Sequence, residues 1–176
     1  MSCALTQNYT LDCKDGVGGL KYVFIIEKDN ATLTYSTGTI SAVVNATSKK
    51  WWKYELVKET ASFKETMNDN VQNGTTFYTQ ELEIVLNKLQ TATRNELLLL
   101  GKAHLWIIAV DFNGKNWLLG YQNGVDRSGG SSETGKAYGD RNGYTISFKG
   151  MEPELAIEVT SAAVGTNFST LTTARS

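Results

Sequence analysis

Alternation of apolar and polar side chains with a period of two is the feature that most constrains this chain. Within Trp51–Val57, every second side chain counted from Trp52 is aromatic or aliphatic, and Lys53 and Glu55 stand between them. Successive side chains of a β-strand point to opposite faces, so this spacing predicts a strand with one buried face. Trp52 fits the core face. Trp51 falls on the opposite face, where it would meet a loop, a partner or water.

The same pattern continues through a longer stretch of the chain. Ala61–Met67 extends it, and Thr75–Leu86 repeats it with Glu81 and Glu83 on the face opposite the apolar side chains. The Asn- and Gly-rich segment Asp69–Gly74 lies between the two. Two long amphipathic strands joined by a short turn of this composition predict a β-hairpin.

Several further segments combine β-branched and aromatic residues with flanking turn formers, which is typical of strands. Asn113-Gly114 separates two of them and is the strongest two-residue hairpin signal in the chain. The additional expected strands are Leu20–Glu27, Thr39–Val44, His104–Asp111, Asn116–Gln122, Gly143–Met151 and Leu155–Val159.

One helix is expected, over about 91–102. Thr93 followed by Glu96 matches a capping box, and Gly101 is suited to end the helix. Four consecutive leucines, Leu97–Leu100, make an apolar surface too wide for one stripe. We therefore expect other parts of the protein to cover this helix on more than one side.

Strands that follow one another with a single inserted helix predict a mainly β protein. The expected fold is a β-sandwich or barrel of antiparallel strands with one flanking α-helix and long loops. Lys28–Lys50 is read as an extended loop or a protruding hairpin, and Asn123–Asn142 as a Gly/Ser-rich loop. No repeat or linker divides residues 1–176, so we expect one domain, with 161–176 as a loose tail.

Composition argues against several classes of function. The 176 residues carry 17 basic and 18 acidic side chains, for a net charge of -1, so there is no general excess of cations to grip nucleic acid. No apolar run is long enough to span a bilayer, and Met1–Leu11 lacks the features of a signal peptide. We therefore expect a protein made in the cytosol, with Cys3 and Cys13 as free thiols.

The sequence also lacks a convincing catalytic, cofactor or metal site. Gly130–Ala137 (GSSETGKA) matches a phosphate-binding loop until its last position, where Ala137 has no hydroxyl for a magnesium ion. His104 is the only histidine and has no clear nucleophile or metal-ligating partner nearby in the sequence. The acidic pair Glu81 and Glu83 fits a solvated or interface face better than a glycosidase site. We expect no enzyme activity and no cofactor.

Four short segments spread over about residues 3–160 resemble one protein family. The chain is similar to the tail tube (major tail) proteins of tailed bacteriophages, especially phages and prophages of the Bacteroides and Flavobacterium groups. The resemblance is one of overall texture rather than of mechanistic motifs. The segments that carry it are Asp12–Gly16 (DCKDG), Trp52–Leu56 (WKYEL), Thr93–Leu97 (TRNEL) and Gly150–Leu155 (GMEPEL).

The resemblance implies a structural role in the virion. Tail tube subunits form hexameric rings whose inner sheets join into one β-barrel channel, and the rings stack through long loops. DNA passes through the lumen during ejection, without specific binding. The implied partners are further copies of the chain, the tape measure protein and other tail proteins, with assembly in the cytoplasm of the host bacterium and no membrane association.

The candidate assembly interface combines this implication with the two-faced strands. Two other interpretations stay open: a monomeric β-sandwich that binds carbohydrate or a receptor through exposed tryptophans, and a neighbouring tail protein such as a terminator or baseplate hub subunit. The residues expected at the interface are Trp51, Lys53, Glu55, Asp69, Asn70, Glu81 and Glu83.

Overall fold

The fold was analysed in a computed structural model, which describes Tyr9 and residues 14–168, apart from the side chains of 165–168. It is mainly β, with two sheets and two helices, which confirms the expected fold class. Cys3 and Cys13 lie outside the described residues. The elements are β1 (Leu20–Glu27), β2 (Ala31–Ser36), β3 (Thr39–Asn45), β4 (Trp52–Glu55), β5 (Ser62–Asn70), β6 (Thr75–Asn87), α1 (Thr91–Leu100), β7 (Leu105–Asp111), β8 (Asn116–Leu119), β9 (Asp126–Glu133), β10 (Gly143–Glu152), β11 (Ile157–Val159) and α2 (Ser161–Phe168).

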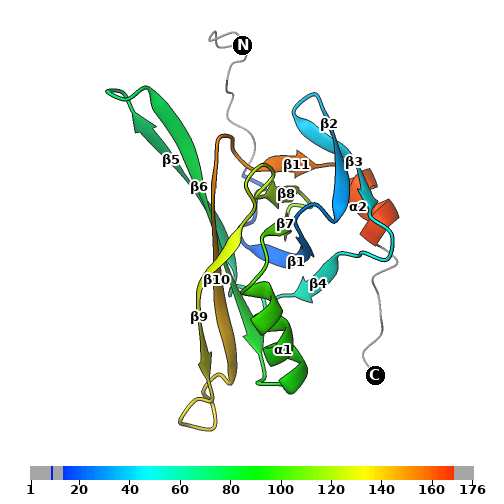
Figure 1. Ribbon diagram of the computed structural model, residues 1–176. Helices are drawn as coiled ribbons and strands as arrows, with labels where there is room; N and C mark the ends of the chain where they lie inside the picture. The colour runs from blue at the N-terminus through cyan, green and yellow to red at the C-terminus, as the bar shows by residue number, and fades with distance from the viewer. Residues whose placement is uncertain (1–8, 10–13, 169–176) are drawn as a thin grey trace.

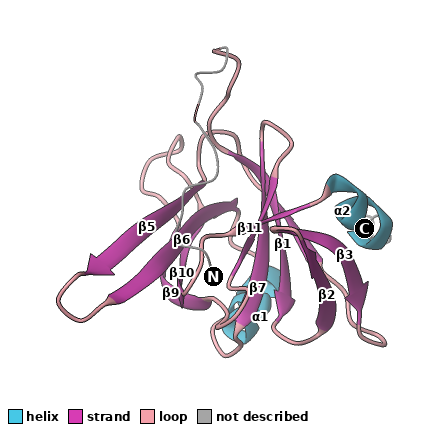
Figure 2. Cartoon of the chain, turned by 90° about the horizontal axis from the view of Figure 1, so that it is seen from above, coloured by secondary structure: helices cyan, strands magenta, loops and turns pink. Residues whose placement is uncertain are grey.

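The strands form one seven-stranded sheet and one four-stranded sheet. The larger has the order β2-β3-β11-β8-β7-β1-β4, and the smaller has the order β5-β6-β10-β9. All pairs are antiparallel except β11 with β3. Figure 1 shows the four-stranded sheet as a long blade beside the rest of the molecule, with the tip of the β5/β6 hairpin extending past the body. Figure 2 shows the same two sheets from above.

The seven-stranded sheet has an apolar core on each of its faces. Strand β7 shows why, because its continuous apolar run LWIIAV is buried at every position. Leu105, Ile107 and Ala109 face the four-stranded sheet and α1, where the first core lies. Trp106, Ile108 and Val110 face the second core, which β2, β3, β11 and α2 help to enclose. A strand that is buried on both faces has apolar side chains at every position, so its sequence does not show which side chains point to which face.

The neighbouring tryptophans lie on opposite faces as expected, but the expected burial of the two is wrong. Trp51 is fully buried in the second core, whereas Trp52 keeps 49% of its surface exposed. Trp51 lies on the face opposite Trp52, and the second core covers that face. Trp52 lies opposite Ile25 on the edge strand β4, and the Lys50 ammonium lies 4.1 Å from the centre of its ring.

The Asn123–Asn142 segment is not simply a loop, because it contains strand β9. β9 is exposed throughout and is built mostly of Ser and Gly, which have low strand propensity. Its backbone pairs with β10 over Asp126–Glu133, and this pairing, rather than the side chains, makes the segment a strand. Gly130 is required there, since a Cβ atom at that position would lie 2.9 Å from the Thr145 carbonyl oxygen.

Two segments for which the sequence does not predict a definite element contain regular secondary structure. Lys28–Lys50, read as a loop or a hairpin, contains the β2/β3 hairpin, whose turn has Thr37 and Gly38 at positive φ. The expected loose tail is wrong for its first part, because α2 begins at Ser161 and buries Ala163 against the second core. Residues 169–176 lie outside the described residues.

The helix occurs where it is expected, but its N-terminal cap and the burial of its leucines differ from the expectation. α1 begins at Thr91 with Gln90 as its N-cap and no side-chain cap bond, so Thr93 lies inside the helix and does not form the expected capping box. Gly101 ends the helix as expected. Leu97 and Leu100 are buried, but Leu98 and Leu99 are 49% and 61% exposed. Within a single chain the helix is therefore covered on one side only.

Candidate assembly surface

The four-stranded sheet has one apolar face and one polar face. Its inner face, with Leu82 and Ile146 among others, packs on the first core. The alternate positions form the outer face, which points away from the seven-stranded sheet. In the register of the sheet, Lys64 on β5 lies opposite Glu81 on β6, and Glu81 lies opposite Lys149 on β10. The outer face therefore carries charges of alternating sign across neighbouring strands.

The lysines on the outer face lie next to carboxylates. The Lys149 ammonium donates a hydrogen bond of 2.9 Å to a Glu81 carboxylate oxygen. This bond, the positive charge of Lys149 and the nearby charge of Lys64 hold the pKa of the Glu81 carboxyl below its ordinary value. Glu83 is exposed two residues further along β6. By register Asp126 and Glu133 of β9 fall on the same face, so its strands carry two lysines and four carboxylates and have no excess of cations.

Both edges of the four-stranded sheet are open within the described part of the chain. β5 pairs only with β6, and β9 pairs only with β10; Val125, just before β9, forms an isolated bridge with Leu105 at the start of β7. Each edge strand presents a row of backbone N–H and C=O groups to solvent. Such edges accept another strand readily, and soluble proteins generally protect them. The smaller sheet therefore has two edges with unpaired backbone groups.

The β5/β6 hairpin extends one of these edges beyond the body of the molecule (Figure 1). Asn70 closes its turn by accepting a hydrogen bond of 3.0 Å from the Asn73 backbone N–H, and Gly74 takes the positive φ of the turn. The hairpin agrees with the expectation for 61–86. Near its tip Met67 and Val71 are 63% and 94% exposed. Large apolar side chains in such a position suit contact with another chain.

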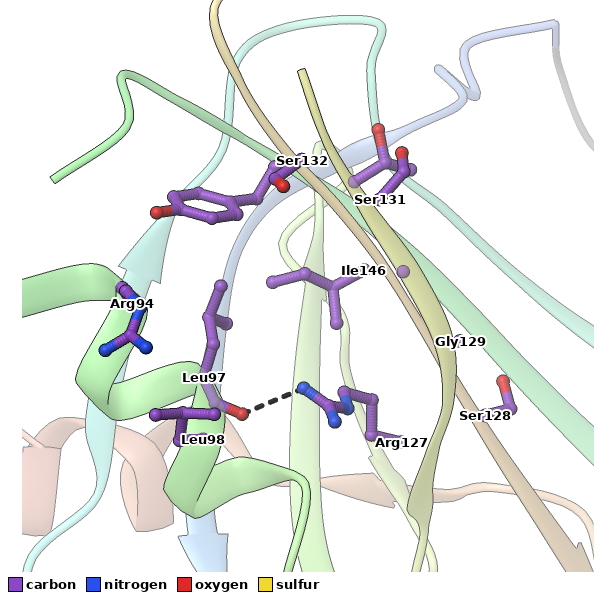
Figure 3. A pocket seen from close by; sticks show the side chains of 12 residues that line it. Arg94, Leu97, Leu98, Arg127, Ser128, Gly129, Ser131, Ser132 and Ile146 are labelled. Atoms are coloured by element: carbon purple, nitrogen blue, oxygen red, sulfur yellow. Dashed lines mark hydrogen bonds between the residues drawn. The ribbon is translucent and has the colours of Figure 1, made fainter. Parts of the chain in front are cut away.

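A groove runs between α1 and β9 along the second edge. Figure 3 shows α1 with Leu97 and Leu98 on one side and β9 on the other, with Ile146 between them. Ser and Gly fill the β9 side and leave the groove open. Arg127 crosses the groove and donates a hydrogen bond of 2.9 Å to the Leu97 carbonyl oxygen (Figure 3). The groove thus combines apolar side chains from Leu97, Leu98 and Ile146 with the positive charge of Arg127.

The residues expected at an interface do not form one surface. Lys53 and Glu55 lie on β4 in the seven-stranded sheet, where they pair with each other at 3.2 Å, and Trp51 is buried beside them. The other four belong to the hairpin of the smaller sheet: Asp69 and Asn70 near its turn, Glu81 and Glu83 on its outer face. Sequence reasoning missed the edge formed by β9, because a Ser/Gly run has no apolar alternation.

The segment that resembles a phosphate loop is occupied by its own chain. The backbone N–H groups of Lys136 and Ala137 donate hydrogen bonds of 2.8 and 2.7 Å to Asp140, and these bonds lower the pKa of the Asp140 carboxyl. The first part of the motif lies in β9, and a turn rather than a helix follows it. The arrangement differs from the strand-loop-helix that a nucleotide phosphate needs.

The remaining chemical candidates are sparse. His104 Nδ1 lies 2.7 Å from an Asp126 carboxylate oxygen, and both side chains are mostly exposed. No group of three or more His, Cys, Asp or Glu able to hold a metal occurs among residues 14–168 and Tyr9. Among the tryptophans, only Trp52 is largely exposed, because Trp51 and Trp106 are buried and Trp117 is half-buried, and the Lys50 ammonium lies over the Trp52 ring. A sugar platform would depend on that one side chain.

The comparisons with known proteins give no relative for this chain. No protein-family model, no curated protein and no solved structure matches it. In the described part of the chain, no helix is long and apolar enough to cross a membrane.

Proposed function

We propose that this chain is a structural subunit that builds the tail tube of a bacteriophage from stacked rings. The observation that carries the proposal is the four-stranded sheet, which combines a polar outer face without an excess of cations with two open edges. The resemblance of four sequence segments to tail tube proteins supports the same class. In the virion the subunit contacts other copies of itself, the tape measure protein and neighbouring tail proteins.

The directions of the edge strands favour a closed ring. Every pairing in the sheet is antiparallel, so β5 and β9, which are three strands apart, run in opposite directions. When copies are related by rotation about a ring axis, β9 of one copy meets β5 of the next as an antiparallel pair. Head-to-tail contacts of this kind make rings when the rotation closes, and a closed barrel leaves no free edge.

The outer face of the sheet then lines the lumen. A channel for DNA must be wetted and must not hold the phosphate backbone, which lysine and arginine would bind. Lys64 and Lys149 are each placed beside Glu81, so their charges are offset where DNA passes. Assembly takes place in the host cytoplasm, and the finished tube is part of the virion tail.

Two observations on one sample test the proposal. Negative-stain microscopy of the purified full-length protein over a range of concentrations is expected to show rings with a central channel, or stacks of them. Mass spectrometry of purified virions is expected to find the chain as an abundant tail component. A protein that is monomeric at every concentration and missing from tails would rule the proposal out.

A terminator or baseplate hub subunit would also form a ring, but it would be present in fewer copies per virion. Quantification of copies per virion separates the two: a tube subunit is present in many stacked rings, and a terminator or hub protein in one or a few. A glycan-binding assay distinguishes a monomeric binding module from a tube subunit. The binding module requires saturable glycan binding that is lost in Trp52→Ala, the one variant that removes a largely exposed tryptophan.

A further inference from the structure

We propose that the groove between α1 and β9 receives strand β5 of a neighbouring copy, with Met67 of that copy seated against Leu98. This inference rests on the proposed ring and specifies the contact that closes it. Four features carry it: an exposed leucine on α1, an edge strand of small residues, an exposed methionine on the opposite edge, and complementary charge. Each is a property of this chain's own residues.

The groove is suited to an apolar side chain flanked by an acid. Leu98 and Ile146 supply apolar surface, and the Ser and Gly residues of β9 leave space beside them. Arg94 and Arg127 line the same groove. Neither arginine has a carboxylate partner among the residues that the structure describes. An occupant that supplies a carboxylate would therefore complete the groove.

The inner face of β5 has that chemistry. Phe63, Glu65, Met67 and Asp69 occupy its alternate positions, as their register with β6 shows. Glu65 is used within its own chain, where its carboxylate accepts hydrogen bonds from Gln80 and from the Ala156 backbone N–H. Met67 is 63% exposed, and Asp69 has no ion-pair partner in the described part of the chain. The apolar and acidic positions next to the tip are thus available to a second copy.

The stagger of the strands determines which residues of β9 in one copy lie opposite which residues of β5 in the next. Asp126 and Lys64 lie on the same row of the sheet, but β5 extends to one end from that row and β9 to the other. An unstaggered contact would overlap only the first residues of the two strands. Strands of a closed barrel tilt by roughly 35–45°, which shifts the register by about one residue per strand and about four per copy of a four-stranded sheet.

A shift of about four residues pairs the two edges along their length. It is even, so inner side chains stay on the inner face. Asp126 then lies opposite Asn68 of the neighbour, and Ser131 lies opposite Lys64. Met67 falls opposite the bulge at Arg127–Ser128, beside the groove, and Asp69 lies one step beyond it on the same face, within reach of Arg127.

Cysteine cross-linking of the full-length chain tests this register directly. In a Cys3→Ser, Cys13→Ser background, Lys64→Cys with Ser131→Cys is expected to give a ladder of cross-linked species on non-reducing gels after mild oxidation. The matched control is Lys64→Cys with Asp126→Cys, which reports the unstaggered register and is expected to give no ladder. Disulfides need Cα atoms within about 7 Å, so the two pairs cannot both form.

A second test uses two adjacent, exposed leucines of α1. Leu98 lines the groove, and Leu99 points to the other side of the helix. Leu98→Glu is expected to raise the protein concentration needed for ring assembly by at least about tenfold, because it puts a carboxylate at the seat of an apolar side chain. Leu99→Glu is expected to leave it unchanged. Circular dichroism of both variants confirms that they fold.

The outcomes separate this inference from the proposed function. If wild-type rings form and the control cysteine pair cross-links instead, or Leu99→Glu weakens assembly as much as Leu98→Glu, the register is wrong and the ring stands. If the wild-type protein does not assemble, both fail. A ladder from the Lys64→Cys, Ser131→Cys pair supports the contact even where Leu98→Glu fails to fold.

Discussion

The two sheets of this protein differ in how much of their surface they bury within the chain. The seven-stranded sheet has a core on each face, and its edge strands β2 and β4 are short. The four-stranded sheet has one buried face, one polar face and two longer open edges, β5 and β9. The larger sheet therefore holds the fold together, and the smaller one is left free for contacts beyond the chain.

The difference explains how folding and the proposed assembly can use separate parts of one domain. A sheet buried on both faces contributes most of the hydrophobic stabilisation, so the smaller sheet can keep polar residues and small side chains without unfolding the chain. Substitutions in the larger sheet are therefore expected to affect stability first. Substitutions at the edges of the smaller sheet are expected to affect assembly first.

The largest effect is expected from Trp51→Ala in the core of the larger sheet. Trp51 is fully buried, and removing a buried aromatic side chain costs about 3–5 kcal/mol of unfolding free energy. Trp52→Ala next to it is the matched control and should cost at most about 1 kcal/mol, since that ring is half exposed. Urea denaturation measures both. Equal losses would contradict the assignment of Trp51 to the second core.

The next effect is expected where the two sheets are joined. Gln80 on β6 is buried; it accepts a hydrogen bond of 2.9 Å from the Gly120 backbone N–H and donates one of 3.0 Å to Glu65. Gln80→Leu leaves that N–H without its acceptor, which costs roughly 1–3 kcal/mol. Thermal unfolding measures the loss. A variant as stable as the wild type would mean that the sheets do not depend on this bond.

A smaller effect is expected from glycines on the open edge of the smaller sheet. Gly130→Ala would place a Cβ atom 2.9 Å from the Thr145 carbonyl oxygen, whereas Gly129→Ala meets nothing within 4 Å. The first change is expected to cost about 1–2 kcal/mol and to weaken assembly, and the second to do neither. Denaturation and sedimentation velocity on both variants test this. The reverse order would contradict the placement of β9.

The smallest effect is expected from the outer face. The pKa of the Glu81 carboxyl is held below its ordinary value by Lys149, so the stability that this pair contributes is present above the unfolded pKa and is lost as pH falls through the folded pKa. The pair is exposed, so the change in stability should be slight. Carbon-13 NMR titration should show the Glu81 pKa rising in Lys149→Ala. An unchanged pKa would show that the pair does not form in solution.

The sequence predicts the smaller sheet's hairpin and the larger sheet's strands for the same reason. Alternation in Thr75–Leu86 and the apolar run His104–Asp111 both report burial, and the structure has strands at both places. The alternation puts Trp51 on the correct face but does not show that this face is buried, because the second core that covers it is assembled from distant segments. α2 was missed because its order comes from packing Ala163 on that same core.

The candidate assembly surface was only partly predictable. Glu81 and Glu83 were placed on a polar strand face by their own spacing, and the structure agrees. β9 was read as a loop because its strand form depends on pairing with β10 and not on its Ser and Gly side chains. Lys53 and Glu55 were grouped with the hairpin because the chain alone does not show that β4 joins the other sheet.

The central claim is that β5 and β9 are open edges that pair between copies. Hydrogen-exchange mass spectrometry of dilute and concentrated protein tests it most directly, because paired backbone amides exchange slowly. Peptides covering Ser62–Asn70 and Asp126–Glu133 are expected to become protected in the assembled sample, while those covering Trp52–Glu55 are expected not to change. Equally fast exchange of both edges in the two samples would contradict it.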